Sequence, residues 1–194
     1  MTKEEFLSGA GEDALRVTGV ASKTVFDGRL LRVTRETVRL PDGKLADWEM
    51  IHHNGAVCVV PVDGDGNVLL VRQFRFPTGS VLLEIPAGKL ESREENRDDA
   101  VRRELREETG AVAERIVSLG DFYTTPAYSE ERITMYYADG LSFGERALDE
   151  DEFLSVVKMP LEEAVGLVLD GKVADAKTQA GLLRVYCMKQ QGLL

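Results

Sequence analysis

The sequence predicts a mixed α/β fold, and three observations support this prediction. Short strand-like segments alternate with a few amphipathic helical segments along the chain, an order typical of α/β domains. The length of 194 residues suits one ordinary domain or a domain with a small extension. Hydrophobic residues make up 43% and charged residues 30%, so the chain can bury a core and intrinsic disorder is not expected.

The first strands are predicted between residues 25 and 49. Apolar and polar residues alternate in part over residues 28–40, and the Pro41-Asp42-Gly43-Lys44 segment is typical of a hairpin turn. These features indicate a small N-terminal β domain over residues 1–50, followed by a larger domain over residues 51–194. Phe26 and Trp48 are expected to pack in the core of the small domain.

The larger domain begins with two predicted core strands. Residues 55–62 form a continuous apolar run, and residues 68–75 form a second run after a turn at residues 63–67. Because the turn is short, the two strands are expected to pair as a hairpin in the core sheet. Cys58 lies in the first run, where a buried and unreactive thiol is expected.

The later elements follow from periodicity and from glycine stop signals. An amphipathic helix is predicted over residues 96–109 with Gly110 ending it. Further strands are predicted at residues 116–122, 132–138 and 153–159, and helices at residues 161–169 and 174–190.

Composition also narrows the function classes. With 24 Lys and Arg against 34 Asp and Glu, the formal net charge is −10, which argues against a protein that coats nucleic acid. The longest apolar stretch is far shorter than the roughly 20 residues of a membrane helix. The N-terminus lacks the basic and apolar regions of a secretory signal, and the two cysteines are too few for a disulfide framework. We therefore expect a cytoplasmic protein that binds neither nucleic acid nor membrane.

Three glutamates on the predicted helix form the most informative pattern. Glu104, Glu107 and Glu108 are separated by three and four positions, so they share one helix face. Like charges at this spacing repel, and a divalent cation such as Mg²⁺ with its preference for oxygen ligands would compensate. The alternative is a solvated acidic face whose glutamates pair with the neighbouring arginines Arg102, Arg103 and Arg106.

The segment from Gly88 to Ala111 resembles the Nudix box, G-x5-E-x7-R-E-U-x-E-E-x-G-U, where U is a bulky aliphatic residue. One extra residue precedes the helix, so the early glutamate of the motif is either Glu94 or Glu95. Ala111 replaces the final aliphatic residue. The resemblance implies a Nudix fold, an α/β/α sandwich with a central mixed sheet. The matching positions are Gly88, Arg103, Glu104, Leu105, Glu107, Glu108 and Gly110.

Further segments resemble one branch of that family. Residues 71–75 and 83–91, together with Pro126 and the following loop, are similar to ADP-ribose pyrophosphatases and nucleoside-diphosphate-sugar hydrolases. The resemblance implies a homodimeric enzyme that hydrolyses the pyrophosphate of ADP-ribose to AMP and ribose 5-phosphate, using Mg²⁺ or alternatively Mn²⁺. Two alternatives stay open: hydrolysis of another nucleotide sugar such as GDP-mannose, and a non-catalytic module that senses nucleotides.

The resemblance also implies roles for individual residues. The metal ligands would be Glu104, Glu107, Glu108 and the carbonyl of Ala87. Glu131 would be the general base, with Glu130 as the open alternative, and Glu107 would assist catalysis. Arg75 would contact the substrate or instead pair with Glu84 or Glu91, and these two glutamates would either contact the substrate or support residues that do. Phe26 and Trp48 could stack on the base of the substrate, since this branch builds its base pocket in the N-terminal element. His52 and His53 are expected to be ordinary structural residues because adjacent side chains in an extended chain point in opposite directions.

Overall fold

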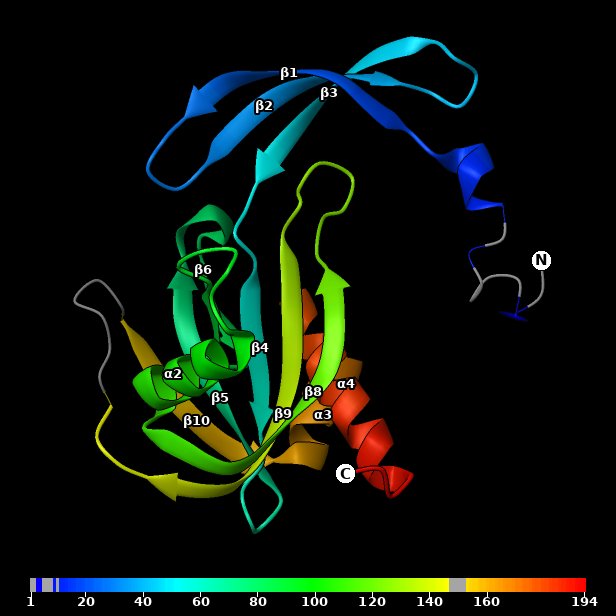
Figure 1. Ribbon diagram of the computed structural model, residues 1–194. Coiled ribbons are helices and arrows are strands. Elements are labelled where there is room, and N and C mark those ends of the chain that lie inside the picture. The colour runs from blue at the N-terminus through cyan, green and yellow to red at the C-terminus, as the bar shows by residue number, and fades with distance from the viewer. Residues whose placement is uncertain (1–2, 5–8, 10, 147–152) are drawn as a thin grey trace. The chain divides into compact units, whose positions relative to one another are not determined.

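The computed structural model describes residues 3–4, 9, 11–146 and 153–194 (Figure 1). Its contacts divide the chain into two compact units. The first unit comprises Met1–His53 and Thr125–Glu131, and the second comprises Asn54–Thr124 and Arg132–Leu194. Within the described residues, every helix is too short or too polar to cross a membrane.

The first unit is built on an antiparallel sheet with the order β1-β2-β3. Its strands are β1 (Thr18–Asp27), β2 (Arg32–Arg39) and β3 (Leu45–His52), preceded by the 3-10 helix η1 (Glu12–Leu15). The antiparallel strands and the turn after β2 are confirmed, although β1 begins earlier than predicted. The expected core positions of Phe26 and Trp48 are wrong, because these side chains are 56% and 48% exposed. Within the described part of this unit, no helix or second sheet packs on the three strands to bury these side chains.

The second unit contains two sheets (Figure 1). The first is mixed, since its central strands run parallel while the outer pairs are antiparallel. Its order is β7 (Ala87–Lys89), β4 (Ala56–Pro61), β9 (Arg132–Phe143) and β8 (Ala111–Tyr123). The second sheet is antiparallel, with the order β10 (Leu154–Pro160), β5 (Asn67–Arg75) and β6 (Ser80–Glu84), and the 3-10 helix η2 (Phe76–Thr78) joins β5 to β6.

The predicted hairpin of the two core strands is wrong. β4 pairs with β7 and β9, while β5 pairs with β6 and β10 in the other sheet. Only an isolated bridge joins Val62 to Val68 where the chain turns. β4 is buried along its whole length, as expected for a strand covered on both faces, and its neighbours on both sides come from distant segments.

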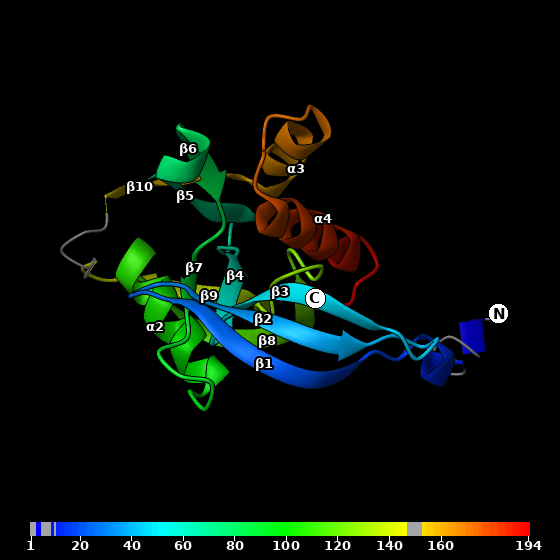
Figure 2. The ribbon, with the colours of Figure 1, turned by 90° about the horizontal axis from the view of Figure 1, so that it is seen from above.

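Helices cover both faces of the mixed sheet, which confirms the predicted sandwich (Figure 2). On one face, Val57 and Val59 of β4 share a core cluster with Leu105 of α2 (Arg97–Thr109). On the other face, Cys58 and Val60 pack in a cluster with residues of α3 (Leu161–Leu169) and α4 (Ala176–Gln190). This alternation follows from the period of two along a strand. Burial raises the pKa of the Cys58 thiol to about 12, as expected for an unreactive cysteine.

Candidate functional site

Helix α2 presents the three box glutamates, and its ends are fixed by local sequence. The Asn96 side chain accepts hydrogen bonds from the backbone N–H groups of Asp98 and Asp99, a typical N-cap. Gly110 ends the helix in the left-handed region at φ +72°. Between these caps, Glu104 and Glu108 are 8% and 3% exposed. The predicted helix is confirmed, and its acidic face is not a solvated surface.

Arg103 lies among the carboxylates. Its guanidinium contacts Glu104 at 2.6 Å, Glu95 at 3.1 Å and Glu107 at 3.3 Å. Desolvation acts to lower the pKa of Arg103, but the charges of Glu104 and Glu95 outweigh it and raise that pKa. The arginine therefore offsets the repulsion that three adjacent carboxylates impose on the helix.

The same contacts distinguish Glu95 from Glu94. Glu95 contacts Arg103 and accepts the backbone N–H of Glu91 at 2.5 Å, while Glu94 is exposed. Counting back from Arg103 therefore identifies the glutamate that joins the box cluster. The extra residue lies between Gly88 and Glu95, in the connection before the helix.

Strand β7 packs directly on the box glutamates through its first two residues, Ala87 and Gly88. The backbone N–H of Ala87 donates to Oε2 of Glu108 at 3.1 Å. A Cβ placed on Gly88 would lie 2.0 Å from Cδ of Glu104 and 2.2 Å from its Oε2. Glycine is therefore required at residue 88 because the Glu104 carboxylate occupies the space that a side chain would need.

This donor set suits a hard divalent cation. Buried carboxylates supply the oxygen ligands that Mg²⁺ prefers, and the close fit at Gly88 keeps one of them against the backbone of β7. Within the described residues, no group of three or more His, Cys, Asp or Glu side chains is arranged to hold a metal ion by itself. Mg²⁺ sites of enzymes that act on phosphates commonly use one or two carboxylates and complete their coordination with water and substrate phosphate. The two buried carboxylates, Glu104 and Glu108, therefore fit a divalent cation whose remaining ligands are water and substrate.

A second charged cluster surrounds the buried carboxylate of Glu84. Arg75 binds it through two parallel hydrogen bonds, Nε to Oε1 at 2.7 Å and Nη2 to Oε2 at 2.9 Å. The ammonium of Lys177 also contacts Glu84 and lies 3.0 Å from Asp175. The alternative that Arg75 pairs with a glutamate is thus observed with Glu84, although the arginine side chain remains 41% exposed. The hydrogen bonds with Glu84 raise the pKa of Arg75, and the charge of Glu108 adds to this effect.

The start of α4 supports this cluster. Asp175 caps the helix by accepting the backbone N–H of Thr178, and the Thr178 hydroxyl accepts the backbone N–H of Ile85. Lys177 is therefore held next to Glu84 by an N-cap and by a buried hydrogen bond. Lys177 was not among the predicted site residues, because the sequence around it indicates only the start of a helix.

Glu84 should contribute pH-dependent stability. Burial acts to raise its pKa, but the contacts with Arg75 and Lys177 outweigh burial and lower that pKa below 4.5. The stabilisation is therefore present above pH 4.5 and is lost as pH falls through the lowered pKa. We expect Glu84→Gln to reduce the free energy of unfolding by about 3 kcal/mol at pH 7.

Urea unfolding of Glu84→Gln and of the wild-type protein at pH 7 and below pH 4 measures this effect. The difference between the two proteins should shrink at the lower pH. The exposed glutamate Glu162 provides a matched control, since Glu162→Gln should leave stability within about 0.5 kcal/mol. An equal loss for Glu84→Gln at both pH values would contradict the assigned charge pairing.

The predicted substrate residue Glu91 has a different setting. Its side chain is exposed, while its backbone carbonyl accepts the amide of Asn54 at 3.0 Å. The structure therefore brings Arg75 and Glu84 together but shows no pairing of Glu91 with Arg75.

The predicted base lies in the first unit, on the loop of residues 125–131. Oε1 of Glu131 is 3.6 Å from Nε2 of His53, and Oε1 of Glu130 is 3.1 Å from Nδ1 of His52. The expectation that both histidines are ordinary missed these contacts. No local sequence pattern places residues 52 and 53 beside a loop almost 80 positions later.

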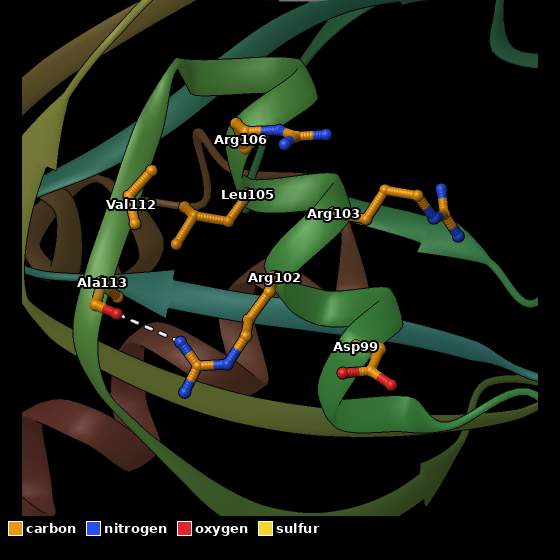
Figure 3. Close-up of a pocket in the computed structure, with 7 residues that line it drawn as sticks. All are labelled: Asp99, Arg102, Arg103, Leu105, Arg106, Val112 and Ala113. Carbon is orange, nitrogen blue, oxygen red and sulfur yellow. Dashed lines mark hydrogen bonds between the residues drawn. The ribbon is translucent and has the colours of Figure 1, made fainter.

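The other side of α2 carries a surface hollow of about 320 Å³ beside β8 (Figure 3). The Arg102 side chain extends across it and donates to the carbonyl of Ala113 at 3.1 Å. Glu104, Glu107 and Glu108 do not line it, but Arg103, which contacts Glu104 and Glu107, does. Its lining residues are Asp99, Arg102, Arg103, Leu105, Arg106, Val112 and Ala113.

Comparison with known proteins places this geometry in a family context. Residues 52–180 match the family described as NUDIX domain, and residues 19–51 match the Nucleoside diphosphate sugar hydrolase N-terminal domain. An ADP-ribose pyrophosphatase of Bacillus subtilis (strain 168) is 42% identical over 161 residues, 82% of this chain and 86% of the relative.

Two further proteins are similar. A GDP-mannose pyrophosphatase of Yersinia enterocolitica is 33% identical over 135 residues, which cover 64% of this chain and 69% of that protein. A crystal structure of an ADP compounds hydrolase superposes with a TM-score of 0.79 at 26% identity. That match covers 93% of this chain and 98% of the other.

Proposed function

The chain belongs to the NUDIX family, as its box residues predicted, and we propose that it hydrolyses the pyrophosphate of ADP-ribose to AMP and ribose 5-phosphate. It is a pyrophosphohydrolase of the type that acts on ADP sugars. The observation that carries the proposal is the buried carboxylate face of α2, fitted against the backbone of residues 87 and 88. The similarity to the Bacillus subtilis ADP-ribose pyrophosphatase supports the choice of substrate.

In this proposal Glu104, Glu107, Glu108 and the carbonyl of Ala87 hold Mg²⁺, with Mn²⁺ as the alternative ion. When bound, the ion would neutralise charge on the phosphoryl oxygens and lower the pKa of a bound water molecule. Glu107 is the least buried of the three glutamates. We assign it the additional role of orienting Glu104 and Glu108. The contacts of Arg103 with Glu104 and Glu107 preserve this set of carboxylates in the absence of the ion.

Arg75 is proposed to bind a substrate phosphate oxygen. Its guanidinium has five N–H donors, and the two donors that bind Glu84 fix its plane while the side chain stays partly exposed. Glu84 then orients the arginine, and Glu91 contributes an exposed carboxylate on the substrate side. Glu131 accepts the proton of the attacking water as general base.

We further propose that the protein is a homodimer of the cytoplasm, with the N-terminal sheet as the interface. The described part of this sheet exposes several apolar side chains that a second copy would cover, and exposed apolar surface is typical of interaction sites. They include Val20, Val25, Phe26, Leu45 and Trp48.

Sedimentation at micromolar concentration should give twice the chain mass of 21.5 kDa. Trp48→Glu places a charge in the proposed interface and should shift the protein toward monomer. A wild-type protein that sediments as a monomer would contradict this proposal.

GDP-mannose is the second candidate substrate, favoured by the similarity to the Yersinia pyrophosphatase. A panel of ADP-ribose, NADH, diadenosine polyphosphates, GDP-mannose and UDP-glucose separates the candidates through release of nucleoside monophosphate. The proposal expects the largest kcat/KM for ADP-ribose. A larger value for GDP-mannose would replace ADP-ribose as substrate while retaining the hydrolytic chemistry.

A further inference from the structure

The loop of residues 125–131 is bonded to the end of β3. The backbone N–H of Ile51 donates to the carbonyl of Tyr128 at 2.7 Å, and the N–H of Glu130 donates to the carbonyl of Ile51 at 3.1 Å. Ile51 and Ser129 form a parallel β-bridge between these bonds. The backbone of the loop therefore continues the N-terminal sheet locally.

The Glu130 side chain adds a second connection. Its Oε1 accepts the backbone N–H of His53 at 3.0 Å and lies 3.1 Å from Nδ1 of His52. On the other side of the ring, Nε2 of His52 is 2.9 Å from the hydroxyl of Thr34, a residue of β2 that is 1% exposed. A continuous series of contacts thus joins the loop to a buried position of the sheet.

The partners also define the imidazole tautomer. Because an ionised carboxylate only accepts hydrogen bonds, we assign the hydrogen of His52 to Nδ1. On the other side of the ring, Nε2 lies beside the Thr34 hydroxyl, which also hydrogen-bonds the Glu36 carboxylate. Oε1 of Glu130 therefore receives two hydrogen bonds, one from the His52 ring and one from the backbone N–H of His53.

We propose that Glu130 and His52 are positioning residues that hold the loop, while Glu131 is the carboxylate that acts on substrate. This inference rests on the proposed function and divides the roles of two adjacent glutamates. Glu130 is committed to the sheet by two donors from β3 and the residue after it. Glu131 differs, since its carboxylate lies 3.6 Å from the His53 ring and its backbone N–H donates to the Ser129 hydroxyl at 3.2 Å.

Two substitutions of His52 test the contact of Nδ1 with Glu130 and the contact of Nε2 with Thr34 separately. In His52→Asn the amide nitrogen lies near the position of Nδ1 and can still donate to Glu130, but the contact with Thr34 is lost. In His52→Gln the amide lies near Nε2 and retains the contact with Thr34, but the contact with Glu130 is lost. The pair therefore tests the link to the loop apart from the link to the sheet.

We expect His52→Gln to lower kcat about tenfold more than His52→Asn, because the loop loses its positioning contact. Amide hydrogen exchange at Ile51 and Glu130 should also be faster in His52→Gln, by roughly tenfold. His52→Asn should have the lower Tm, since the buried Thr34 hydroxyl loses its contact with the ring. Glu49→Gln, an exposed glutamate on β3, should leave kcat, exchange and Tm close to wild type.

The glutamates themselves provide the complementary test. Glu130→Gln keeps an acceptor oxygen for both donors and should retain far more kcat than Glu130→Ala. Glu131→Gln should lower kcat by about 10²-fold to 10⁴-fold, which is the usual contribution of a general base. A larger loss of kcat for Glu130→Gln than for Glu131→Gln would overturn the division of roles.

The readouts distinguish failure of this inference from failure of the proposed function. Equal exchange rates and equal kcat in His52→Asn and His52→Gln would overturn the positioning role while wild-type hydrolysis remained. A wild-type protein that releases no AMP would overturn the proposed function, and with it the catalytic role assigned to the loop. Amide hydrogen exchange at Ile51 and Glu130 would still decide whether His52 anchors the loop of residues 125–131.

Discussion

Glu108→Gln should lower kcat for ADP-ribose by about 10³-fold, because the proposed metal site loses one negative ligand and several kcal/mol of transition-state stabilisation. The fold should survive, since glutamine keeps an oxygen that accepts the Ala87 N–H and preserves the buried shape. Initial rates of AMP release at saturating Mg²⁺ measure the loss, and thermal unfolding reports the fold.

The matched control for this variant is Glu162→Gln. Glu162 is an exposed glutamate in the first turn of α3, so its substitution removes the same charge outside the carboxylate cluster. Its kcat should remain close to wild type. Near-normal turnover of Glu108→Gln at saturating Mg²⁺ would refute the assignment of Glu108 as a ligand.

Gly88→Ala should have the next largest effect. The added Cβ would meet the Glu104 carboxylate at 2.0 to 2.2 Å, so the carboxylate or strand β7 must move. We expect kcat to fall about 100-fold, which is typical of a misplacement near 1 Å. Stability should fall by about 1–3 kcal/mol, the usual cost of overpacking. Steady-state kinetics and urea unfolding measure the two effects.

Gly64→Ala is the control for Gly88→Ala, since a Cβ at residue 64 meets nothing within 4 Å. Combining Gly88→Ala with Glu104→Asp shortens the opposing side chain, so the double variant should recover part of the lost stability. Wild-type kcat and stability in Gly88→Ala would show that the close packing of residues 88 and 104 has no functional consequence.

Much of the fold could be predicted because its signals are local. Helix α2 is bounded by Asn96 and Gly110, residues whose side-chain or backbone conformations end helices. Helix α3 has the predicted bounds of residues 161–169. The separation of β4 and β5 into two sheets could not be predicted, because the partners β9 and β10 lie far along the chain and apolar runs do not specify partners.

The candidate site divides in the same way. Helical periodicity places Glu104, Glu107 and Glu108 on one face, so their shared position could be read from spacing. The contact between Glu84 and Lys177 spans 93 positions, and no local pattern encodes it. Similarly, the anchoring of Glu130 by His52 depends on how a distant loop meets the end of β3.

The geometry also explains how a chain with a formal charge of −10 is suited to an anionic substrate. Arg103 offsets the carboxylates of α2, and Arg75 and Lys177 surround Glu84. In the proposed enzyme a bound cation reverses the sign of the local charge at the box glutamates. Net charge therefore describes the surface of the chain and not the site.

The most direct test of the proposed function is incubation of the wild-type protein with ADP-ribose and Mg²⁺, followed by chromatography of the products. The proposal predicts AMP and ribose 5-phosphate in equal amounts, with no release after chelation by EDTA or in Glu108→Gln at matched protein concentration. Intact ADP-ribose that is bound tightly and reversibly, with no AMP released, would contradict the proposal and identify the chain as a nucleotide-sensing module.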